Sequence, residues 1–387
     1  MLKLRIINKP KMYKLKCNFT FPNIILANMQ EKEVTPTKEI QEVVPDIQYD
    51  GLSKVTVNPI PDEYVKPSGT LDISGNGTYD VTNYENANVN VGGLEINDGS
   101  YLFYDGARFS AFDGLIDILK NPVSLSNFMY SSTKNIIITN DKSKKLEKIN
   151  TSNCTNFFNA FYNVKFDDSI DLIDLNNWDM SKATNLQYAF YHTSFGNTKL
   201  LIDKWDISSV KNIYGLFNGS DITEIDVSNW NVENVTDMGY MFNNCKFENL
   251  DISKWKPYKL SNLTFMFNNC QKLKEIDLSN WVVNSLKSIG SMFWSCYALE
   301  KADISGLSNG LINNTYGTFQ YCSKLATLII NSRNFLNMSN INMLQSTPIA
   351  NGTGYVYVPD DMVDTYKSAT NWSTYASQIK GMSELVW

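Results

Sequence analysis

Five aspartates recur at one position of an internal repeat, and their spacing is the feature of the sequence that could support chemistry. Each lies four residues before a tryptophan, or before Leu307, which replaces the tryptophan in one repeat. The five are Asp174, Asp226, Asp251, Asp277 and Asp303. Stacked about 5 Å apart, these carboxylates would repel one another by roughly 1 kcal/mol per neighbour even in water.

The aspartate ladder allows two interpretations. One is a strip that binds a cation or a basic ligand. The other is a set of turn caps, in which each carboxylate accepts hydrogen bonds from nearby backbone N–H groups. The recurring string Asp-x-Ser-x-Trp favours the caps, and the chain contains no EF-hand spacing.

Cysteines occupy a second repeated position, shortly after a recurring phenylalanine. They are Cys245, Cys270, Cys296 and Cys322, and they follow one another at almost equal intervals. Stacked thiols would lie within disulfide range. In other repeats the same position holds Gly106, Thr133, Val164, Thr193 and Ser220, which share only small size. The sequence therefore favours free thiols packed in a tight buried slot.

Other residues give little support to catalysis. His192 is the only histidine, so a Ser–His–Asp or Cys–His nucleophile would have to use it as the base. Its repeat position elsewhere holds Asn or Gly, which indicates a turn. Closely spaced cysteine pairs for zinc and glycine-rich phosphate loops are both missing from the sequence. We expect no catalytic residue, no cofactor and no metal.

Variable residues alternate along the predicted strands, where they should project from the open face. They are Leu172, Glu224, Asn249, Glu275, Lys301 and Thr327. They differ in charge and size, which is typical of a binding face and equally of a plain solvated face. The possible ligand face comprises Glu224, Asn249, Glu275 and Lys301 with Asp226, Asp251, Asp277 and Asp303.

An internal repeat organises all these positions. A column of mainly phenylalanines recurs once in each copy: Phe103, Tyr130, Phe161, Phe190, Phe217, Phe242, Phe267, Phe293, Phe319 and Leu344. A second column precedes the first at a constant offset: Trp178, Trp205, Trp230, Trp255, Trp281 and Leu307. Such regular spacing predicts stacked coils in which like aromatic rings form rows.

Two periods alternate within each repeat. Leu260, Leu263, Phe267 and Cys270 follow the three-to-four spacing of a short helix. The string Leu273-x-x-Ile276-x-Leu278 follows the period of two of a short strand. One helix and one strand cannot bury their own apolar faces, whereas stacked copies can. We therefore expect an α/β fold: a leucine-rich-repeat-like solenoid with one short parallel strand and one short helix per repeat.

The repeat resembles a known family. The string Met-Phe-x-x-Cys-x-x-Leu-x-x-Ile-Asp-Leu-Ser-x-Trp, specific over 178–319, is similar to the repeat of BspA-like bacterial surface proteins. The tail from Tyr355 through Tyr375 looks like the C-terminal cap of that family. The resemblance implies a surface-exposed module for binding or adhesion. It supplies no catalytic residues.

Residues 1–30 form a basic segment in an otherwise acidic chain. The whole chain carries a formal charge of −6, whereas this segment contains six basic residues and no acid. These are Lys3, Arg5, Lys9, Lys11, Lys14 and Lys16. Alternating apolar residues on both sides of Asn8–Lys11 predict a β-hairpin. We expect a docking arm that grips an acidic partner, since the polar interruptions argue against a signal peptide.

Residues 31–93 differ from the repeats. Tyr49–Asn58 and Tyr79–Val91 alternate apolar residues after turn signals, so both indicate small antiparallel β-modules. The sequence around Asn76–Tyr84 resembles β-modules of bacteriophage tail, fibre and head-decoration proteins. We expect four parts: an arm at 1–30, β-modules at 31–93, the solenoid at 94–345 and a cap at 346–387.

These features together predict a non-enzymatic bacteriophage virion protein, in a head-decoration, head-fibre or tail position. A virion protein assembles in the host cytoplasm and needs no export signal. Its arm would bind other virion proteins, and its solenoid a host surface protein or glycan. We expect no membrane insertion, and homo-oligomers are possible. The alternatives are a bacterial cell-surface adhesin and, more remotely, a carbohydrate-active enzyme that uses the aspartates.

Overall fold

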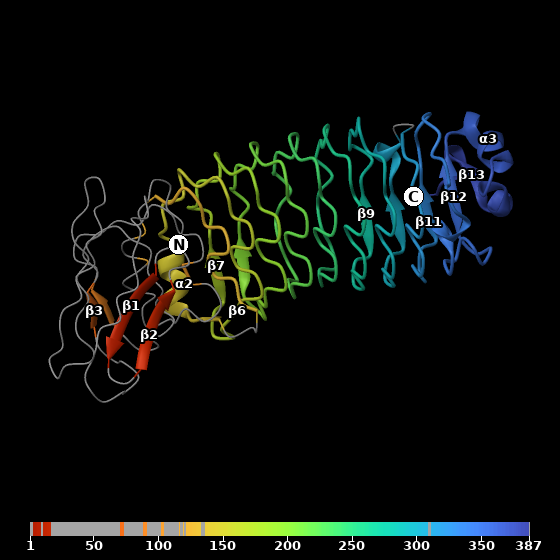
Figure 1. Cartoon of the computed structure of the whole chain (residues 1–387). Coiled ribbons are helices and arrows are strands. Elements are labelled where there is room, and N and C mark those ends of the chain that lie inside the picture. Colours follow the sequence, from red (N-terminus) through yellow and green to blue (C-terminus); the bar gives the residue numbers. More distant parts are fainter. Residues whose placement is uncertain are drawn as a thin grey trace.

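A computed structural model gives the arrangement of the chain (Figure 1). It describes four N-terminal strands: β1 (Lys3–Asn8), β2 (Lys11–Lys16), β3 (Thr70–Asp72) and β4 (Asn88–Asn90). It also describes residues 102–103, 116, 119, 121–132, 136–308 and 311–386.

The fold is mixed α/β, with parallel strands and short helices. The strands after residue 130 are β5 (Ile137–Ile138), β6 (Lys165–Phe166), β7 (Leu172–Asp174), β8 (Lys199–Leu201), β9 (Glu275–Asp277), β10 (Lys301–Asp303), β11 (Thr327–Ile329), β12 (Tyr355–Val358) and β13 (Ile379–Gly381). Within the residues that the structure describes, the α-helices whose two ends are defined are α2 (Asn140–Leu146) and α3 (Val363–Ser368), and the 3₁₀ helices are η1 (Ser305–Leu307), η2 (Ile341–Leu344), η3 (Asp360–Met362), η4 (Trp372–Gln378) and η5 (Met382–Glu384).

Successive coils of the chain lie side by side from residue 121 onward (Figure 1). A row of parallel bridges joins one residue of each coil to its counterpart in the next: Ser124, Asn156, Asn185, Asn212, Asp237, Asn262, Ser288 and Asn314. Elsewhere on the coils, β7 pairs with β8, and β9 to β13 form one five-stranded sheet. The pairing partners are one repeat apart, as stacking of like positions requires.

The tryptophans form a single buried row, which confirms the stacking predicted for Trp230, Trp255 and Trp281. The ring centroids of Trp230 and Trp255 are 6.4 Å apart, and those of Trp255 and Trp281 are 5.8 Å apart. Each indole also donates a hydrogen bond to a backbone carbonyl of the preceding coil. For Trp255 the acceptor is the carbonyl of Val227, at 2.9 Å. The row thus combines apolar burial with satisfaction of the indole N–H.

The phenylalanines form a second buried row. Between Phe161 and Phe319 neighbouring centroids are 5.2 to 5.9 Å apart and the rings are nearly parallel. One assignment from the sequence is wrong by one residue. Met129, not Tyr130, occupies the row, because its N–H pairs with the carbonyl of Ala160, which precedes Phe161. Tyr130 instead stacks on Tyr162, with centroids 4.5 Å apart.

The short helix predicted for each repeat is wrong over 260–270, where the chain forms consecutive turns. Phe265 and Asn269 both have a φ of 58°, which no α-helix accommodates. Alternate backbone amides bond outside their own coil. The Phe267 N–H donates to the Met292 carbonyl of the next coil, whereas the Met266 N–H donates to the Leu263 carbonyl of its own coil. An α-helix would use these amides internally, so the turns are what joins neighbouring coils here.

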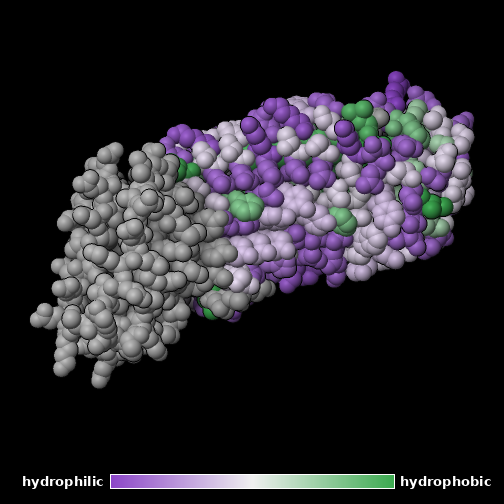
Figure 2. Space-filling model, viewed as in Figure 1, coloured by the Kyte–Doolittle hydropathy of each residue, from purple (hydrophilic) through white to green (hydrophobic). Residues whose placement is uncertain are grey.

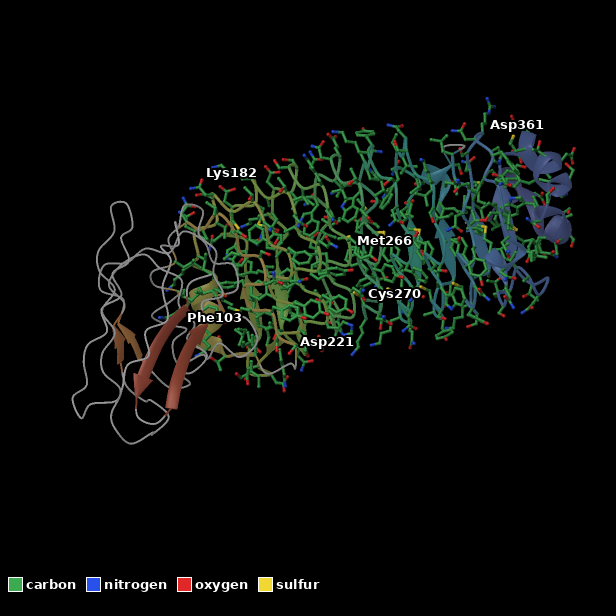
Figure 3. All side chains as sticks on the ribbon, in the orientation of Figure 1. Phe103, Lys182, Asp221, Met266, Cys270 and Asp361 are labelled. Atoms are coloured by element: carbon green, nitrogen blue, oxygen red, sulfur yellow. The ribbon has the colours of Figure 1, made fainter. Side chains whose placement is uncertain are left out.

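The cysteine column is buried and its thiols are free, as predicted. Each of the four thiols donates to the backbone carbonyl of the phenylalanine in the preceding coil. For Cys270 the acceptor is the Phe242 carbonyl, 3.0 Å from Sγ (Figure 3). Thr193 makes the same bond to Phe161 at 2.7 Å. Where the column holds cysteine or Thr193, the small side chain also donates a hydrogen bond, whereas the buried Val164 fits by size alone. Burial raises the pKa of the Cys245 thiol to about 12, so it stays protonated.

The four N-terminal strands test only part of what the sequence predicts for residues 1–93. β1 and β2 pair antiparallel, with Asn8 opposite Lys11. β3 and β4 pair parallel; β3 lies outside both predicted modules, Tyr49–Asn58 and Tyr79–Val91, so this pair does not test their antiparallel arrangement. The intervening segment, 73–87, is long enough for a parallel crossover. Residues 49–58 and 79–87, Lys9, and the side chains of Lys3, Arg5, Lys11, Lys14 and Lys16 lie outside the described parts.

The C-terminal segment continues the sheet of the preceding coils. β12 pairs in parallel with β11, and β13 pairs in parallel with β12. α3 and η4 pack beyond β13 at the end of the stack (Figure 1). Trp372 is fully buried and its indole donates to the Leu336 carbonyl at 2.8 Å. The last edge of the core is thereby covered.

Candidate functional site

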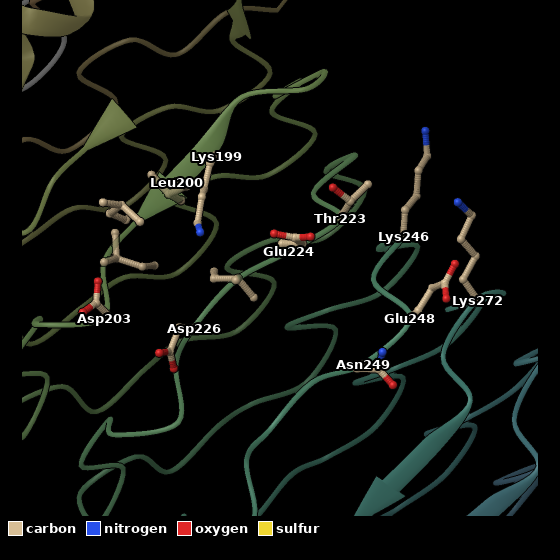
Figure 4. Close-up of a pocket in the computed structure, with 13 residues that line it drawn as sticks. Lys199, Leu200, Asp203, Thr223, Glu224, Asp226, Lys246, Glu248, Asn249 and Lys272 are labelled. Carbon is tan, nitrogen blue, oxygen red and sulfur yellow. The ribbon is translucent and has the colours of Figure 1, made fainter. Parts of the chain in front are cut away.

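A groove of about 620 Å³ lies on the strand side of the coils, between β8 and β9 (Figure 4). It is lined by Lys199, Leu200, Leu201, Ile202, Asp203, Thr223, Glu224, Ile225, Asp226, Lys246, Glu248, Asn249 and Lys272. Apolar side chains form the base of the groove, and side chains of both charges form its edges.

The groove coincides with an interruption in strand pairing. β8 and β9 are separated by two coils, and in these coils residues 224–226 and 249–251 form no strand. Ile225 and Leu250 keep the apolar residue at the centre of each segment. Parallel pairing draws neighbouring coils to about 4.8 Å, so its absence here leaves room between them.

Charges of both signs surround the groove. Lys199, Lys246 and Glu224 are exposed. The Lys274 ammonium lies 2.9 Å from the Glu248 carboxylate, and this contact lowers the pKa of Glu248. Lys246 and Lys272 extend in the same direction from neighbouring coils (Figure 4). The arrangement suits a polar partner that carries both donors and acceptors.

The groove gathers only part of the predicted ligand face. Glu224, Asn249 and Asp226 line it. Glu275 and Lys301 lie outside it, opposite each other in the paired strands β9 and β10. The remaining predicted residues, Asp251, Asp277 and Asp303, also lie outside the lining.

The aspartates cap turns, as the favoured interpretation predicted. The Asp251 carboxylate accepts the Ser253 N–H at 3.1 Å and the Ser253 hydroxyl at 2.8 Å. The same backbone bond recurs at Asp174, Asp226, Asp277 and Asp303, with distances of 2.8 to 3.0 Å. Each carboxylate thus gains local donors that offset repulsion between neighbours.

Two of these caps have opposite pKa shifts. Hydrogen bonds from Ser253 lower the pKa of Asp251, whereas burial raises the pKa of Asp303 despite similar bonds from Ser305. A lowered pKa adds stability above the unfolded value, near 3.8, and this stability is lost as the pH falls through the folded pKa. A raised pKa adds stability only below the unfolded value, and this is lost as the pH rises through the folded pKa.

We expect Asp251→Asn and Asp303→Asn to change stability in opposite directions at pH 7. Asparagine keeps the acceptor oxygen, so each change removes mainly the charge. Asp251→Asn should lower the free energy of unfolding slightly, because the carboxylate is exposed, and Asp303→Asn should raise it. Urea unfolding at pH 7 and pH 3 measures both, and the two differences should shrink at pH 3. Changes of the same sign at pH 7 would contradict this account.

Sequence reasoning missed several residues of the groove. Lys199 occupies the same position as Glu224, six residues before a tryptophan, so the repeat register could have found it. Lys246, Glu248 and Lys272 precede the strand positions, where the repeat pattern sets no residue type. Nothing in the apolar pattern signals the loss of pairing, because Ile225 and Leu250 match Ile276 of β9.

His192 is a turn residue, as expected. Its φ is 51°, and the matching positions Asn163, Gly219 and Asn244 also have positive φ. Its ring lies 4.4 Å from that of Tyr191, centroid to centroid. Among the described residues, no group of three His, Cys, Asp or Glu side chains could hold a metal ion. Within the same residues, no helix has the length and apolar character to span a membrane.

Comparison with known proteins gives a family. A protein-family model described as "Mycoplasma protein of unknown function, DUF285" matches residues 124–246, 155–275, 192–307 and 222–332. Neither the curated proteins nor the solved structures contain a match. The overlapping windows span more than half of the chain and fit a repeat-containing family. The chain therefore belongs to the DUF285 family of Mycoplasma proteins of unknown function.

Proposed function

We propose that this protein is a non-enzymatic recognition protein, a leucine-rich-repeat-like solenoid that binds a surface protein or glycan. The observation that carries the proposal is the groove between β8 and β9, where an ordered stack of coils loses strand pairing. The face of the stack seen in Figure 2 is mostly hydrophilic, with scattered apolar side chains. The groove exposes apolar side chains beside charged ones, which is the composition of a specific binding surface.

The chemistry of the groove supports binding more than catalysis. The carboxylates of Asp226, Asp251 and Asp277 accept serine N–H groups, and those of Asp226 and Asp251 also accept serine hydroxyls. The bonds from Ser253 lower the pKa of Asp251, which makes this carboxyl group a poor general acid. The enzyme alternative remains testable: a glycan-hydrolysis assay of the wild type against Asp251→Asn and Asp277→Asn should show no activity that depends on either residue.

We propose two settings for this recognition function. The basic arm and the resemblance of residues 31–93 support a bacteriophage virion, in which the arm binds other virion proteins. The family match supports the alternative, an adhesin of the bacterial surface. Antibody labelling in electron microscopy separates them: label on purified particles supports the virion, and label on intact cells without particles supports the adhesin.

A charge reversal in the groove should weaken binding. The full chain carrying Lys199→Glu and Lys246→Glu should bind cells of the organism that carries the gene, or of the phage host, at least tenfold more weakly. The reason is repulsion of acceptor groups that the lysines would otherwise bind. Flow cytometry with labelled protein measures this.

The matched control also reverses two lysines, but away from the groove. Lys254→Glu and Lys324→Glu should bind within about twofold of the wild type, because surface charges outside the contact change affinity little. Equal loss in both double variants would show a general charge effect and would refute the groove as the binding surface.

A further inference from the structure

A ladder of aromatic rings on the turn side of the coils lacks one rung, and we propose that this gap binds a neutral sugar ring of a glycan. The inference rests on the proposed recognition function and deepens it. The ring ladder consists of Phe158, Tyr188, Tyr214, Tyr240 and Phe265. It shares no residue with the groove between β8 and β9.

Each coil contributes one ring to the ladder. The centroid distances are 6.3 Å for Phe158–Tyr188, 5.3 Å for Tyr188–Tyr214, 5.4 Å for Tyr214–Tyr240 and 4.8 Å for Tyr240–Phe265. The ring comes from either of two adjacent repeat positions, two or three residues before the buried phenylalanine row. Burial raises the pKa of Tyr240, so its hydroxyl stays neutral.

The coil after Phe265 breaks this pattern. Both of its ladder positions are small, Gly290 and Ser291, and the next coil supplies a ring again at Tyr316. The backbone is not the reason for the gap. Ser291 has a φ of 53°, close to the 55° of Tyr240 and the 58° of Phe265. The position of Ser291 carries a ring in three other coils, at Tyr188, Tyr240 and Phe265, and none here.

The gap is a cavity of about 440 Å³. Its lining consists of Thr264, Phe265, Asn268, Gly290, Ser291, Trp294, Asn314 and Tyr316. Two coil steps of about 4.8 Å each separate the coils of Phe265 and Tyr316, which leaves room for one ring about 5 Å from either. Trp294 forms a wall, with its ring centroid 6.1 Å from that of Tyr316.

The lining selects a neutral ligand with several hydroxyl groups. None of the eight lining residues is charged, although the chain as a whole carries −6. A charged ligand would lose hydration without gaining a partner. Phe265, Trp294 and Tyr316 offer flat apolar faces for the C–H groups of a pyranose.

Polar lining residues favour a sugar over an aromatic side chain. Thr264, Asn268 and Asn314 border the apolar faces. The Thr264 hydroxyl already lies 3.0 Å from the Ser288 hydroxyl and the Asn268 amide donates to the Asn243 oxygen at 2.6 Å, so each keeps only its remaining hydrogen or lone pair for a ligand. The Asn314 amide already donates to the Ser288 hydroxyl at 2.9 Å, which holds this side chain in place. An aromatic side chain carries at most one polar atom, whereas a sugar ring presents several and can bond to more of these groups.

The test places an aromatic side chain in the gap of the ring ladder. The probes are the methyl glycosides of glucose, galactose and N-acetylglucosamine, with glucuronic acid and N-acetyltyrosinamide as charged and aromatic comparisons. Saturation-transfer NMR on the full chain should show binding of at least one neutral glycoside and stronger binding of it than of either comparison probe. Ser291→Tyr should weaken that binding at least tenfold, and Lys324→Tyr, at an exposed position outside the lining, should leave it within about twofold.

Ser291→Tyr should fold, because Tyr240 occupies the matching position with the same backbone conformation. If circular dichroism shows that it does not, Phe265→Ala removes one wall and should also weaken binding at least tenfold. Tighter binding of glucuronic acid or N-acetyltyrosinamide would overturn the assignment, as would undiminished glycoside binding in the variants or no binding of any neutral glycoside.

The outcome is separable from that of the proposed function. If the groove variants abolish cell binding but no glycoside binds, the sugar site is wrong and the recognition function stands. If a glycoside binds and Ser291→Tyr removes it while the wild type binds no cell or particle, the sugar site stands and the proposed recognition function fails.

Discussion

Replacing Trp255 with alanine should lower the free energy of unfolding by at least about 4 kcal/mol, since truncation of a buried tryptophan costs about 3–5 kcal/mol. Trp255 is 1% exposed and lies between two other indoles of its row. The change also leaves the Val227 carbonyl without the indole donor 2.9 Å away, and a buried acceptor left unbonded costs about 1–3 kcal/mol more. Urea unfolding followed by circular dichroism measures the loss.

Two variants separate burial from hydrogen bonding at this position. Trp255→Phe keeps a ring but removes the donor, so its loss should be dominated by the unbonded carbonyl of Val227. Trp255→Leu should be tolerated better than alanine, because Leu307 occupies the same row and is fully buried. A loss below about 1.5 kcal/mol for Trp255→Ala would contradict the claim that the row stabilises the stack.

The rows of like residues could be predicted from the sequence, whereas the backbone between them could not. Equal spacing of Trp230, Trp255 and Trp281 requires equal positions on successive coils, and stacking then follows from burial. The three-to-four spacing around Phe267 does not distinguish a helix from consecutive turns, because both place those residues on one side. The deciding feature is positive φ.

Positive φ was only partly visible in the sequence. Gly219, Asn244 and Asn269 mark one left-handed position of the coil, since glycine and asparagine favour that conformation. Tyr240 and Phe265, at another position of the coil, also adopt the left-handed conformation, which aromatic residues rarely do. Their stacking in the ring ladder gives a physical reason, because contacts between neighbouring rings contribute about 0.5–1.5 kcal/mol each and offset backbone strain.

The candidate site lies where two coils lack the strand pairing of the coils on either side. The variable strand positions were found because their neighbours recur, and Glu224 and Asn249 do line the groove. Loss of pairing at these two coils is a tertiary property: Ile225 and Leu250 are apolar, as a paired strand would also require. A repeat pattern therefore predicts where side chains point but not where coils separate.

Replacing Phe267 with alanine should lower the free energy of unfolding by about 3–5 kcal/mol. Phe267 is fully buried, 5.6 Å from Phe242 and 5.2 Å from Phe293 between ring centroids. Urea unfolding gives the total loss, and amide exchange shows where the stack opens, because each coil contacts mainly its neighbours. A double-mutant cycle with Phe242→Ala should show coupling of about 0.5–1.5 kcal/mol.

Cys270→Ser is the matched change in the same coil, three residues from Phe267. Serine keeps a donor for the Phe242 carbonyl, which the Cys270 thiol bonds at 3.0 Å, and Ser220 already occupies this column in another coil. Its loss should therefore be much smaller than that of Phe267→Ala. Reducing agent should leave the wild type unchanged. A large loss that reducing agent reproduces in the wild type would mean that the thiols are bridged, and the stack would then depend on covalent links in addition to its aromatic rows.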